Sequence, residues 1–283
     1  MSLAAPLVST DWLHANLDAA RIIDASWRMP GEPPAYKDYQ RRHISGAVFF
    51  DIDALADKST DLPHMLPSPS DFENAVGALG VNEDDAVVVY DDQGLFSAPR
   101  VWWTFRAMGH ARVAVLDGGL RKWIAEGRAV DDRAPRPSPQ RYKASPKRDL
   151  VADAETVRTA IADAAPRIVD ARPAARFRGA APEPRAGLRS GHMPGALNVP
   201  VDRIVRDDGT LADDAALRAA FEDAGVDVDA PIITTCGSGV TAAVAGLALE
   251  VLGHRRWRLY DASWAEWARR DHDSSVYPVV VDV

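Results

Sequence analysis

The chain has 283 residues, of which 47% are hydrophobic and 26% are charged, with 20 prolines and 19 glycines. This composition is typical of a folded globular protein and argues against a disordered, fibrous or membrane-embedded chain. The length favours two domains, each large enough to bury a core. The formal charge of -8 argues against partnership with nucleic acid or an anionic membrane, so an anionic ligand needs a local basic cluster.

The N-terminal sequence has neither the basic region nor the apolar run of a signal peptide. The longest apolar stretch, residues 240–249, stops at Glu250, well short of the roughly 20 residues that span a bilayer. The single cysteine, Cys236, cannot form an internal disulfide or a cysteine-type metal site, which favours a reducing compartment. We therefore expect a cytoplasmic protein without a transmembrane segment.

The sequence contains an internal repeat. Three segments of the first half, ARIIDASW (20–27), RHISGAVFFDID (42–53) and AVVVYDDQG (86–94), correspond in order to PRIVDARP (166–173), GHMPGALNVPVD (191–202) and PIITTCGSG (231–239). Spacing is also kept, since Asp91 precedes Asp117 by 26 positions and Cys236 precedes Asp261 by 25. We therefore expect the chain to contain two copies of one domain.

Short β-branched runs in each copy, such as residues 86–90 and 231–235, are followed by longer helical patterns. Continuously apolar strands that alternate with helices are typical of a parallel sheet covered on both faces. The sequence therefore predicts an α/β protein with an N-terminal domain over residues 1–140 and a C-terminal domain over residues 151–283. A charged stretch with four prolines, residues 131–150, leads from one copy to the other, and the connector is placed at its end, residues 141–150.

The loop around Cys236 joins an apolar strand to an apolar helix, in the stretch IITTCGSGVTAA. Ligands bind outside the carboxyl ends of the strands in an open parallel sheet, and Cys236 follows such an end. A thiolate is favoured at a helix N-terminus, and Gly237 and Gly239 let successive amides converge on one anion. The loop is interpreted as an anion cradle around a sulfur; the alternative is a small buried hydrophobic residue.

Two chemistries could use this loop. A cysteine phosphatase of the Cys-x5-Arg type needs an arginine six positions after the cysteine, and this chain has Ala242 there. Sulfur transfer needs only a thiolate that attacks an outer sulfur and a loop that holds the resulting persulfide anion. The residues favour sulfur transfer.

The chain resembles the two-domain rhodanese family over essentially its whole length. The resemblance is carried by the tandem copies, by GHMPGA in the second copy and by CGSGVTA at the loop. The loop is similar to the branch that uses 3-mercaptopyruvate, because thiosulfate-using relatives carry a basic pair where this chain has Gly237 and Ser238. The resemblance implies two tandem rhodanese-like domains. It also implies a sulfurtransferase that moves the sulfur of 3-mercaptopyruvate through a Cys236 persulfide to cyanide or to a thiol such as reduced thioredoxin, releasing pyruvate. Neither cofactor nor metal is implied.

The resemblance also implies roles for side chains outside the loop. Arg176 and Arg185 match the ligands of the substrate carboxylate and carbonyl, for which guanidinium groups are suited; the role of Arg178 stays open. Asp53 and His64 resemble the outer members of a triad completed by Ser238, in which Asp53 orients His64 and His64 polarises the serine. The remaining expected substrate contacts come from the loop: Gly237, Gly239, Val240 and Thr241.

Three other functions stay open. A thiosulfate sulfurtransferase is disfavoured by the missing basic pair, and an arsenate or phosphate enzyme by Ala242. A persulfide carrier with little turnover needs only the cysteine, so the other site residues argue against it. His43 and His192 recur in both copies, although only one copy has the cysteine, so we expect both to be structural.

Overall fold

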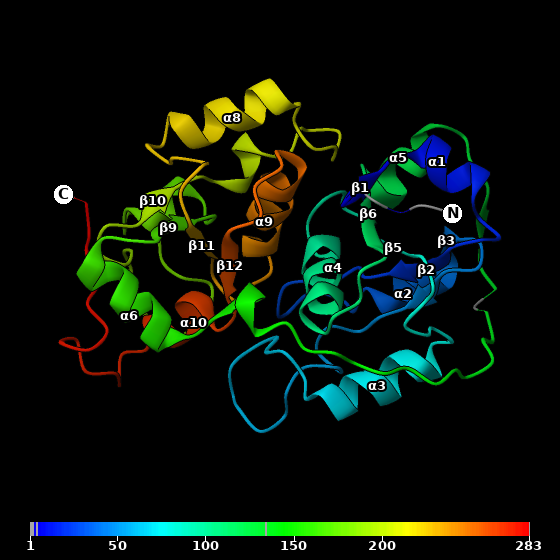
Figure 1. Ribbon diagram of the computed structural model, residues 1–283, viewed down its shortest axis with the longest axis horizontal. Helices are drawn as coiled ribbons and strands as arrows, with labels where there is room; N and C mark the ends of the chain where they lie inside the picture. The colour runs from blue at the N-terminus through cyan, green and yellow to red at the C-terminus, as the bar shows by residue number, and fades with distance from the viewer. Residues whose placement is uncertain (1–2, 4, 134, 283) are drawn as a thin grey trace. The chain divides into compact units, whose positions relative to one another are not determined.

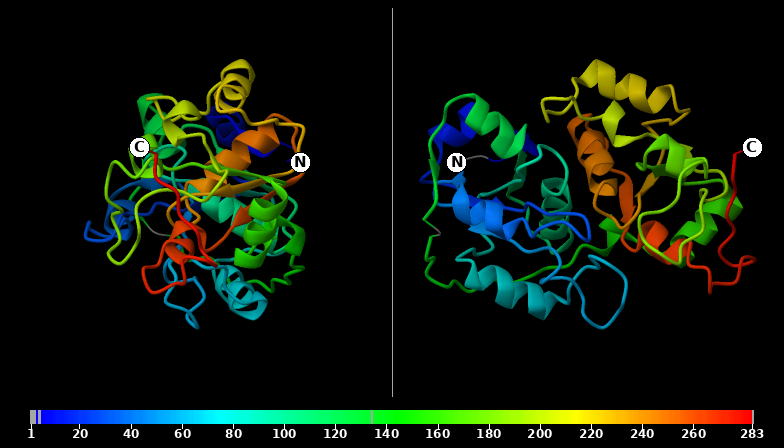
Figure 2. Two further views of the ribbon diagram at one scale, coloured as in Figure 1. Left: turned by 90° about the vertical axis from the view of Figure 1, so that its left-hand side faces the viewer. Right: turned by 180° about the vertical axis from the view of Figure 1, so that it is seen from behind.

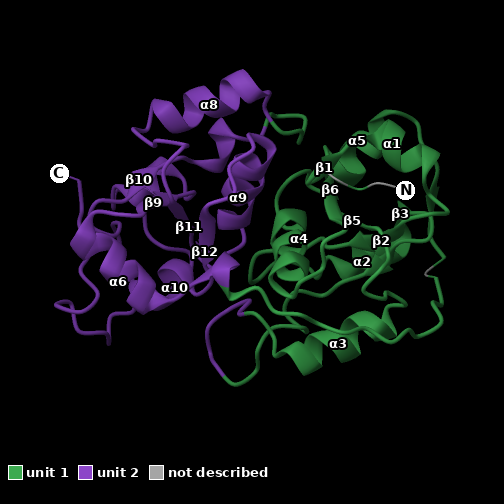
Figure 3. Cartoon of the chain, in the orientation of Figure 1, with its two compact units in different colours: residues 1–59, 66–148, 206–211 green, residues 60–65, 149–205, 212–283 purple. Residues whose placement is uncertain are grey.

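The computed structural model describes residues 3, 5–133 and 135–282, and the chain divides into two compact units (Figure 1, Figure 3). Unit 1 contains residues 1–59, 66–148 and 206–211, and unit 2 contains residues 60–65, 149–205 and 212–283. Residues 60–65 thus belong to unit 2 although they lie in the first half of the sequence, and residues 206–211 belong to unit 1 although they lie in the second half. The first of these segments contains His64.

Unit 1 is built on a five-stranded parallel sheet in the order β1-β6-β5-β2-β4, with a small antiparallel pair β3-β7 beside it. Its strands are β1 (Leu7–Val8), β2 (Arg21–Asp24), β3 (His43–Ile44), β4 (Val48–Phe49), β5 (Val87–Tyr90), β6 (Val113–Leu116) and β7 (Val130–Asp131). Its helices are α1 (Thr10–Ala15), α2 (Tyr36–Arg41), α3 (Pro69–Ala78), α4 (Ala98–Ala107) and α5 (Gly119–Ala125). Helices α1 and α5 lie on one side of the strands and α3 on the other (Figure 2).

Unit 2 has a five-stranded parallel sheet in the order β10-β9-β11-β12-β8. Its strands are β8 (Val151–Ala152), β9 (Arg167–Asp170), β10 (Leu197–Asn198), β11 (Ile232–Thr235) and β12 (Trp257–Tyr260). Its α-helices are α6 (Ala154–Asp163), α7 (Ala174–Phe177), α8 (Asp214–Glu222), α9 (Ala242–Val251) and α10 (Ser263–Trp267). Two short 3-10 helices complete the order, η1 (Arg148–Leu150) and η2 (Val201–Arg203).

The two sheets have the same strand order when β8, β12, β11, β9 and β10 are matched with β1, β6, β5, β2 and β4. The predicted α/β fold with one parallel sheet in each half is confirmed. In unit 2 the last residues of the central strands are paired, Thr235 with Asp170, so β9 and β11 end together. The residues that follow each of these strands therefore share one edge of the sheet.

Local sequence explains where several helices begin. The side chains of Ser68 and Asp153 accept hydrogen bonds from the first turns of α3 and α6, and Pro69 occupies the start of α3, where its missing N–H costs nothing. Helix α9 is buried from Ala242 to Glu250, in agreement with its nearly uniform apolar sequence. Among the described residues, no helix is both long enough and apolar enough to cross a membrane.

Candidate active site

Cys236 is the first residue after β11, and its side chain is buried, with 2% of the residue exposed. Its N–H donates to Ser263 Oγ at 3.2 Å, and its carbonyl accepts from the N–H of Trp264 at 3.0 Å. The carbonyl of Gly237 accepts from the N–H of Ala265 at 2.9 Å. The beginning of the cysteine loop is therefore fixed by the first turn of α10.

The rest of the loop, residues 237–241, curls toward the N-terminus of α9. Gly239 has φ of +78°, a left-handed conformation that favours glycine. Within the part of the chain that the structure describes, no hydrogen bond has the N–H of Gly237, Ser238 or Val240 as donor. These amides remain available to an anion on the sulfur, and the adjacent helix N-terminus adds partial positive charge.

The equivalent loop of unit 1 shows what this backbone arrangement binds. Asp91 follows β5 as Cys236 follows β11, and its Oδ2 accepts from the N–H groups of Phe96, Ser97 and Ala98 at 2.8 to 2.9 Å. Its Oδ1 accepts from the N–H of Gln93 at 3.0 Å. The unit 1 loop thus encloses a carboxyl group of its own chain, whereas the unit 2 loop has a sulfur at the corresponding place.

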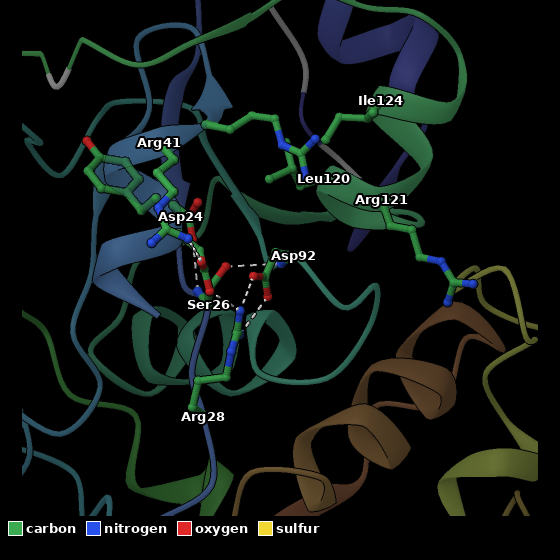
Figure 4. A pocket seen from close by; sticks show the side chains of 11 residues that line it. Asp24, Ser26, Arg28, Arg41, Asp92, Leu120, Arg121 and Ile124 are labelled. Carbon is green, nitrogen blue, oxygen red and sulfur yellow. Dashed lines mark hydrogen bonds and ion pairs between the residues drawn. The ribbon is translucent and has the colours of Figure 1, made fainter. Parts of the chain in front are cut away.

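Beside this loop, unit 1 has a pocket of about 640 Å³ whose side chains are shown in Figure 4. The Arg28 guanidinium donates to Asp92 at 2.9 Å and to Asp38 at 2.9 Å, and the N–H of Asp92 donates to Ser26 Oγ at 3.0 Å. Asp24, at the end of β2, is buried, and burial raises its pKa. The pocket is lined mainly by charged and hydroxyl side chains, together with Leu120 and Ile124, and has no thiol.

Arg176 lies at the end of α7 and reaches the cysteine loop. A Cβ placed on Gly237 would be 3.1 Å from Nη2 of Arg176, so the guanidinium lies directly against the residue that follows the cysteine. Glu183 forms an ion pair with Arg176 and accepts from its Nε at 3.2 Å. The Arg176 side chain keeps 20% of its surface exposed, which leaves it able to meet a substrate carboxylate.

A second arginine behind Arg176 was not identified from the sequence. Arg172 is buried, donates to Asp170 from Nη2 at 2.6 Å and to Glu183 from Nη1 at 2.8 Å, and lies over the Trp264 ring. Glu183 thus joins a buried arginine to a partly exposed one and fixes both. The signal in the sequence was the position of Arg172, two residues after the strand end at Asp170.

Ser263 is the other residue missed by sequence reasoning. It is fully buried with φ of +50°, donates from Oγ to the carbonyl of Tyr260 at 2.8 Å, and accepts from the N–H of Cys236. A non-glycine residue rarely adopts this backbone conformation, which occurs where the surrounding structure enforces it. No local sequence pattern indicates such a contact across 27 positions.

Arg185 and His64 lie together in unit 2. Arg185 Nη2 and His64 Nε2 are 3.2 Å apart. Because a guanidinium has only donors, Nε2 of His64 is the acceptor in this contact. His64 is 4% exposed and has φ of +63°. The histidine expected in the triad is therefore buried and contacts one of the two arginines expected to bind substrate.

The other expected triad members lie in different units. Ser238, 5% exposed, is in the cysteine loop of unit 2, whereas Asp53 is in unit 1 and accepts from Trp27 Nε1 at 2.8 Å. The triad stays a prediction. Both repeated histidines are buried, and each makes a hydrogen bond to a backbone carbonyl, Nδ1 of His43 with that of Tyr39 and Nδ1 of His192 with that of Phe177.

The remaining loop residues expected to contact substrate are Val240 and Thr241. Val240 is buried, and Thr241 is the residue that precedes the first turn of α9. Among the described residues, no group of three His, Cys, Asp or Glu side chains is arranged to hold a metal ion.

A family model described as "Rhodanese-like domain" matches the chain twice, over residues 9–126 and 153–270. The 3-mercaptopyruvate sulfurtransferase of Escherichia coli K12 is 45% identical over 276 residues, covering 96% of this chain and 98% of that protein. The thiosulfate sulfurtransferase of Rattus norvegicus is 44% identical over 273 residues, covering 93% of this chain and 92% of that protein.

A solved structure gives the same result for the fold. The crystal structure of SseA from Escherichia coli, whose description names the rhodanese fold and 3-mercaptopyruvate sulfotransferases, matches with a TM-score of 0.85 at 43% identity. The match covers 93% of this chain and 100% of that chain. The similarity therefore extends over both repeats.

Proposed function

Since the chain belongs to the family of proteins with rhodanese-like domains, we propose that it is a sulfurtransferase that uses 3-mercaptopyruvate as sulfur donor. The sulfur passes through a Cys236 persulfide to a thiol acceptor, and pyruvate is released. One observation carries this proposal: Cys236 occupies the place at which the equivalent loop of unit 1 encloses the Asp91 carboxylate with four N–H groups.

The choice of donor rests on the charge of the loop. Gly237 and Ser238 supply amides but no cation, and the guanidinium next to the loop, that of Arg176, is already paired with Glu183. One partly neutralised arginine suits the single carboxylate of a keto acid better than the thiosulfate dianion. Thiosulfate is the alternative donor, because a thiosulfate sulfurtransferase is nearly as similar to this chain.

The proposed reaction has two halves. The Cys236 thiolate attacks the sulfur of 3-mercaptopyruvate, the S–S bond forms, and the C–S bond breaks with its electron pair passing to carbon. The product is the enolate of pyruvate, which takes up one proton to give pyruvate. In the second half an acceptor thiolate, such as that of reduced thioredoxin, or cyanide attacks the outer sulfur and restores the Cys236 thiolate. No step needs an organic cofactor or a metal ion.

The arginines and the triad residues supply the remaining functions. Arg176 and Arg185 hold the carboxylate and the carbonyl oxygen of the donor, where negative charge develops as the enolate forms. Ser238 delivers the proton to the enolate carbon. In this proposal His64 polarises Ser238, and Asp53 orients His64. Gly237, Gly239, Val240 and Thr241 form the loop that holds the persulfide. With one thiol and no internal disulfide, we place the enzyme in the cytoplasm.

The test is steady-state release of pyruvate and sulfuration of cyanide with 3-mercaptopyruvate and, in parallel, sulfuration of cyanide with thiosulfate. The wild type is compared with Cys236→Ser and with Arg178→Ala, whose arginine is exposed in the same segment as Arg176. We expect a preference for 3-mercaptopyruvate of at least about 100-fold, loss of turnover in Cys236→Ser, and wild-type rates in Arg178→Ala.

Two results would contradict the proposal. Equal or better use of thiosulfate would assign the second function, a thiosulfate sulfurtransferase. Absence of turnover with both donors, together with uptake of sulfane sulfur by Cys236 from a partner enzyme, would make the protein a persulfide carrier.

A further inference from the structure

Residues 60–65, with the sequence TDLPHM, form a segment that belongs to unit 2 although the residues around them belong to unit 1 (Figure 3). Leu62 and Met65 pack against the hydrophobic core of unit 2. Between them lies His64, which is buried against Arg185. The segment is thus bound to unit 2 by its own side chains rather than by the chain that precedes it.

The polar contact at the outer end of the segment is an ion pair. Nη1 of Arg269 lies 2.9 Å from both carboxylate oxygens of Asp61. Asp61 keeps 74% of its side chain exposed, whereas Arg269 keeps 31% and also contacts Asp271 at 3.3 Å. Arg269 is therefore the better ordered partner of the pair, and it restrains Asp61.

Arg269 is connected to the cysteine loop through a short stretch of chain. It lies just after α10, and its N–H donates to the carbonyl of Glu266 at 3.3 Å. The first turn of the same helix binds the carbonyls of Cys236 and Gly237. A single-turn helix with a bond at each end therefore links the cysteine loop to the residue that holds Asp61.

The inner end of the segment needs external support. His64 has φ of +63°, a conformation that non-glycine residues avoid and that persists only where neighbouring structure enforces it. A cavity of about 430 Å³ adjoins the segment and is lined by residues that include Asp61, Leu62, Arg185 and Arg269. The ion pair thus borders the same cavity as the arginine that His64 contacts.

We infer that Arg269 is a positioning residue: its two-oxygen contact with Asp61 holds the 60–65 segment on unit 2 and thereby keeps His64 against Arg185. The inference that this affects turnover rests on the proposed function, whereas the structural part does not. Loss of the ion pair loosens the segment, and the contact of His64 with Arg185 weakens with it. The donor should bind more weakly, because Arg185 is expected to hold it.

The experiment compares Arg269→Gln and Asp61→Asn with a matched control, Arg270→Gln. Arg270 is the neighbouring arginine, is exposed, and borders the same cavity, so the control loses the same charge. Amide hydrogen exchange of the 60–65 segment is measured by mass spectrometry, and kcat and KM for 3-mercaptopyruvate are measured separately. Exchange should accelerate about three- to tenfold and KM should rise by a similar factor in the two test variants, with kcat less affected.

A charge-reversed pair separates positioning from simple loss of structure. In the double variant Asp61→Arg with Arg269→Asp the ion pair can form again. Exchange should therefore be slower, and KM closer to the wild-type value, than in either single reversal. Raising the salt concentration to about 0.5 M should bring the wild-type KM toward that of Arg269→Gln, because the exposed side of the ion pair is screened. The Arg269→Gln KM should respond to salt no more than that of Arg270→Gln.

The inference is overturned if exchange of residues 60–65 is the same in Arg269→Gln and Arg270→Gln. It is also overturned if exchange accelerates while kcat and KM match those of the control, because the segment would then have no positioning role. Should the wild type turn over neither donor, the proposed function fails, and the exchange measurement still decides whether Arg269 fastens the segment.

Discussion

Gly237 sets the distance between the cysteine loop and the Arg176 guanidinium. It is one of the few glycines whose φ lies outside the left-handed region, so its role is space rather than backbone freedom. Glu183 holds Arg176 from the other side, and Glu183 is itself fixed by the buried Arg172. A guanidinium restrained in this way is preorganised for a carboxylate next to the sulfur.

Replacing Gly237 with Ala puts a methyl group 3.1 Å from Arg176 Nη2, so the guanidinium must move by a few tenths of an ångström. We expect the KM for 3-mercaptopyruvate to rise about three- to tenfold with a smaller change in kcat, and stability to change by less than about 0.5 kcal/mol. Steady-state kinetics and urea unfolding check both expectations.

Gly225→Ala is the control for this prediction. Gly225 has φ of +80° and open space around a Cβ, so the substitution should cost about 1 to 2 kcal/mol of stability and leave KM unchanged. An unchanged KM in Gly237→Ala would mean that Arg176 does not bind the donor in the position described.

At the scale of elements, β11, the cysteine loop and α9 act as one structural piece. Helix α9 is buried along nearly its whole length and packs on β12. Gly246 makes this possible, because a Cβ there would lie 2.2 Å from the Trp257 ring. The close approach of helix and strand fixes the N-terminus of α9, and with it the amides of the loop.

Gly246→Ala tests this packing. Alanine gains about 1 kcal/mol in helix propensity, but the overlap with Trp257 forces the helix or the ring to move, which costs about 1 to 3 kcal/mol or more. We expect the free energy of unfolding to fall by about 1 to 2 kcal/mol in urea denaturation. Adding Trp257→Phe to Gly246→Ala should restore part of the lost free energy of unfolding, because phenylalanine lacks the outer ring carbons of Trp257 that overlap with the new methyl group. Equal stability of Gly246→Ala and the wild type would contradict this account.

At the scale of the whole molecule, one fold is used twice with different groups at the same strand end. Both units have a five-stranded parallel sheet in matching order, and in both a loop follows the middle strand. Unit 1 has Asp91 there and unit 2 has Cys236. The Asp91 carboxyl group accepts hydrogen bonds from the amides of its own loop, so unit 1 has a buried titratable group where unit 2 has the thiol.

Burial raises the pKa of Asp91 from 3.8 to about 7. Between about pH 4 and 7 the unfolded chain releases this proton and the folded chain keeps it, so Asp91 makes stability fall as the pH rises through this range. The full effect is at most about 1.4 kcal/mol per pH unit. Urea unfolding at several pH values should show a steeper loss for the wild type than for Asp91→Asn.

The opposite slope is a clear alternative outcome. If stability of the wild type rises with pH relative to Asp91→Asn, the four N–H donors keep Asp91 ionised in the folded protein. The unit 1 loop would then be a stronger anion cradle than its burial suggests.

The sequence by itself determined the duplication, the parallel sheets and the place of Cys236 after a central strand. These features follow from short-range patterns: β-branched runs, helical periodicity and glycines at a turn, all of which act over a few neighbouring residues. The apolar sequence of α9 likewise agrees with its burial in the structure.

Only the tertiary structure decided which side chains surround the cysteine loop. The contacts of Ser263 with Cys236, of Glu183 with two arginines and of His64 with Arg185 join residues that no periodic pattern relates. The same holds for the 60–65 segment, which belongs to unit 2 although the sequence places it in the first repeat. Such contacts depend on how buried side chains fill space and satisfy charge across the folded chain, and this is settled only when distant segments pack together.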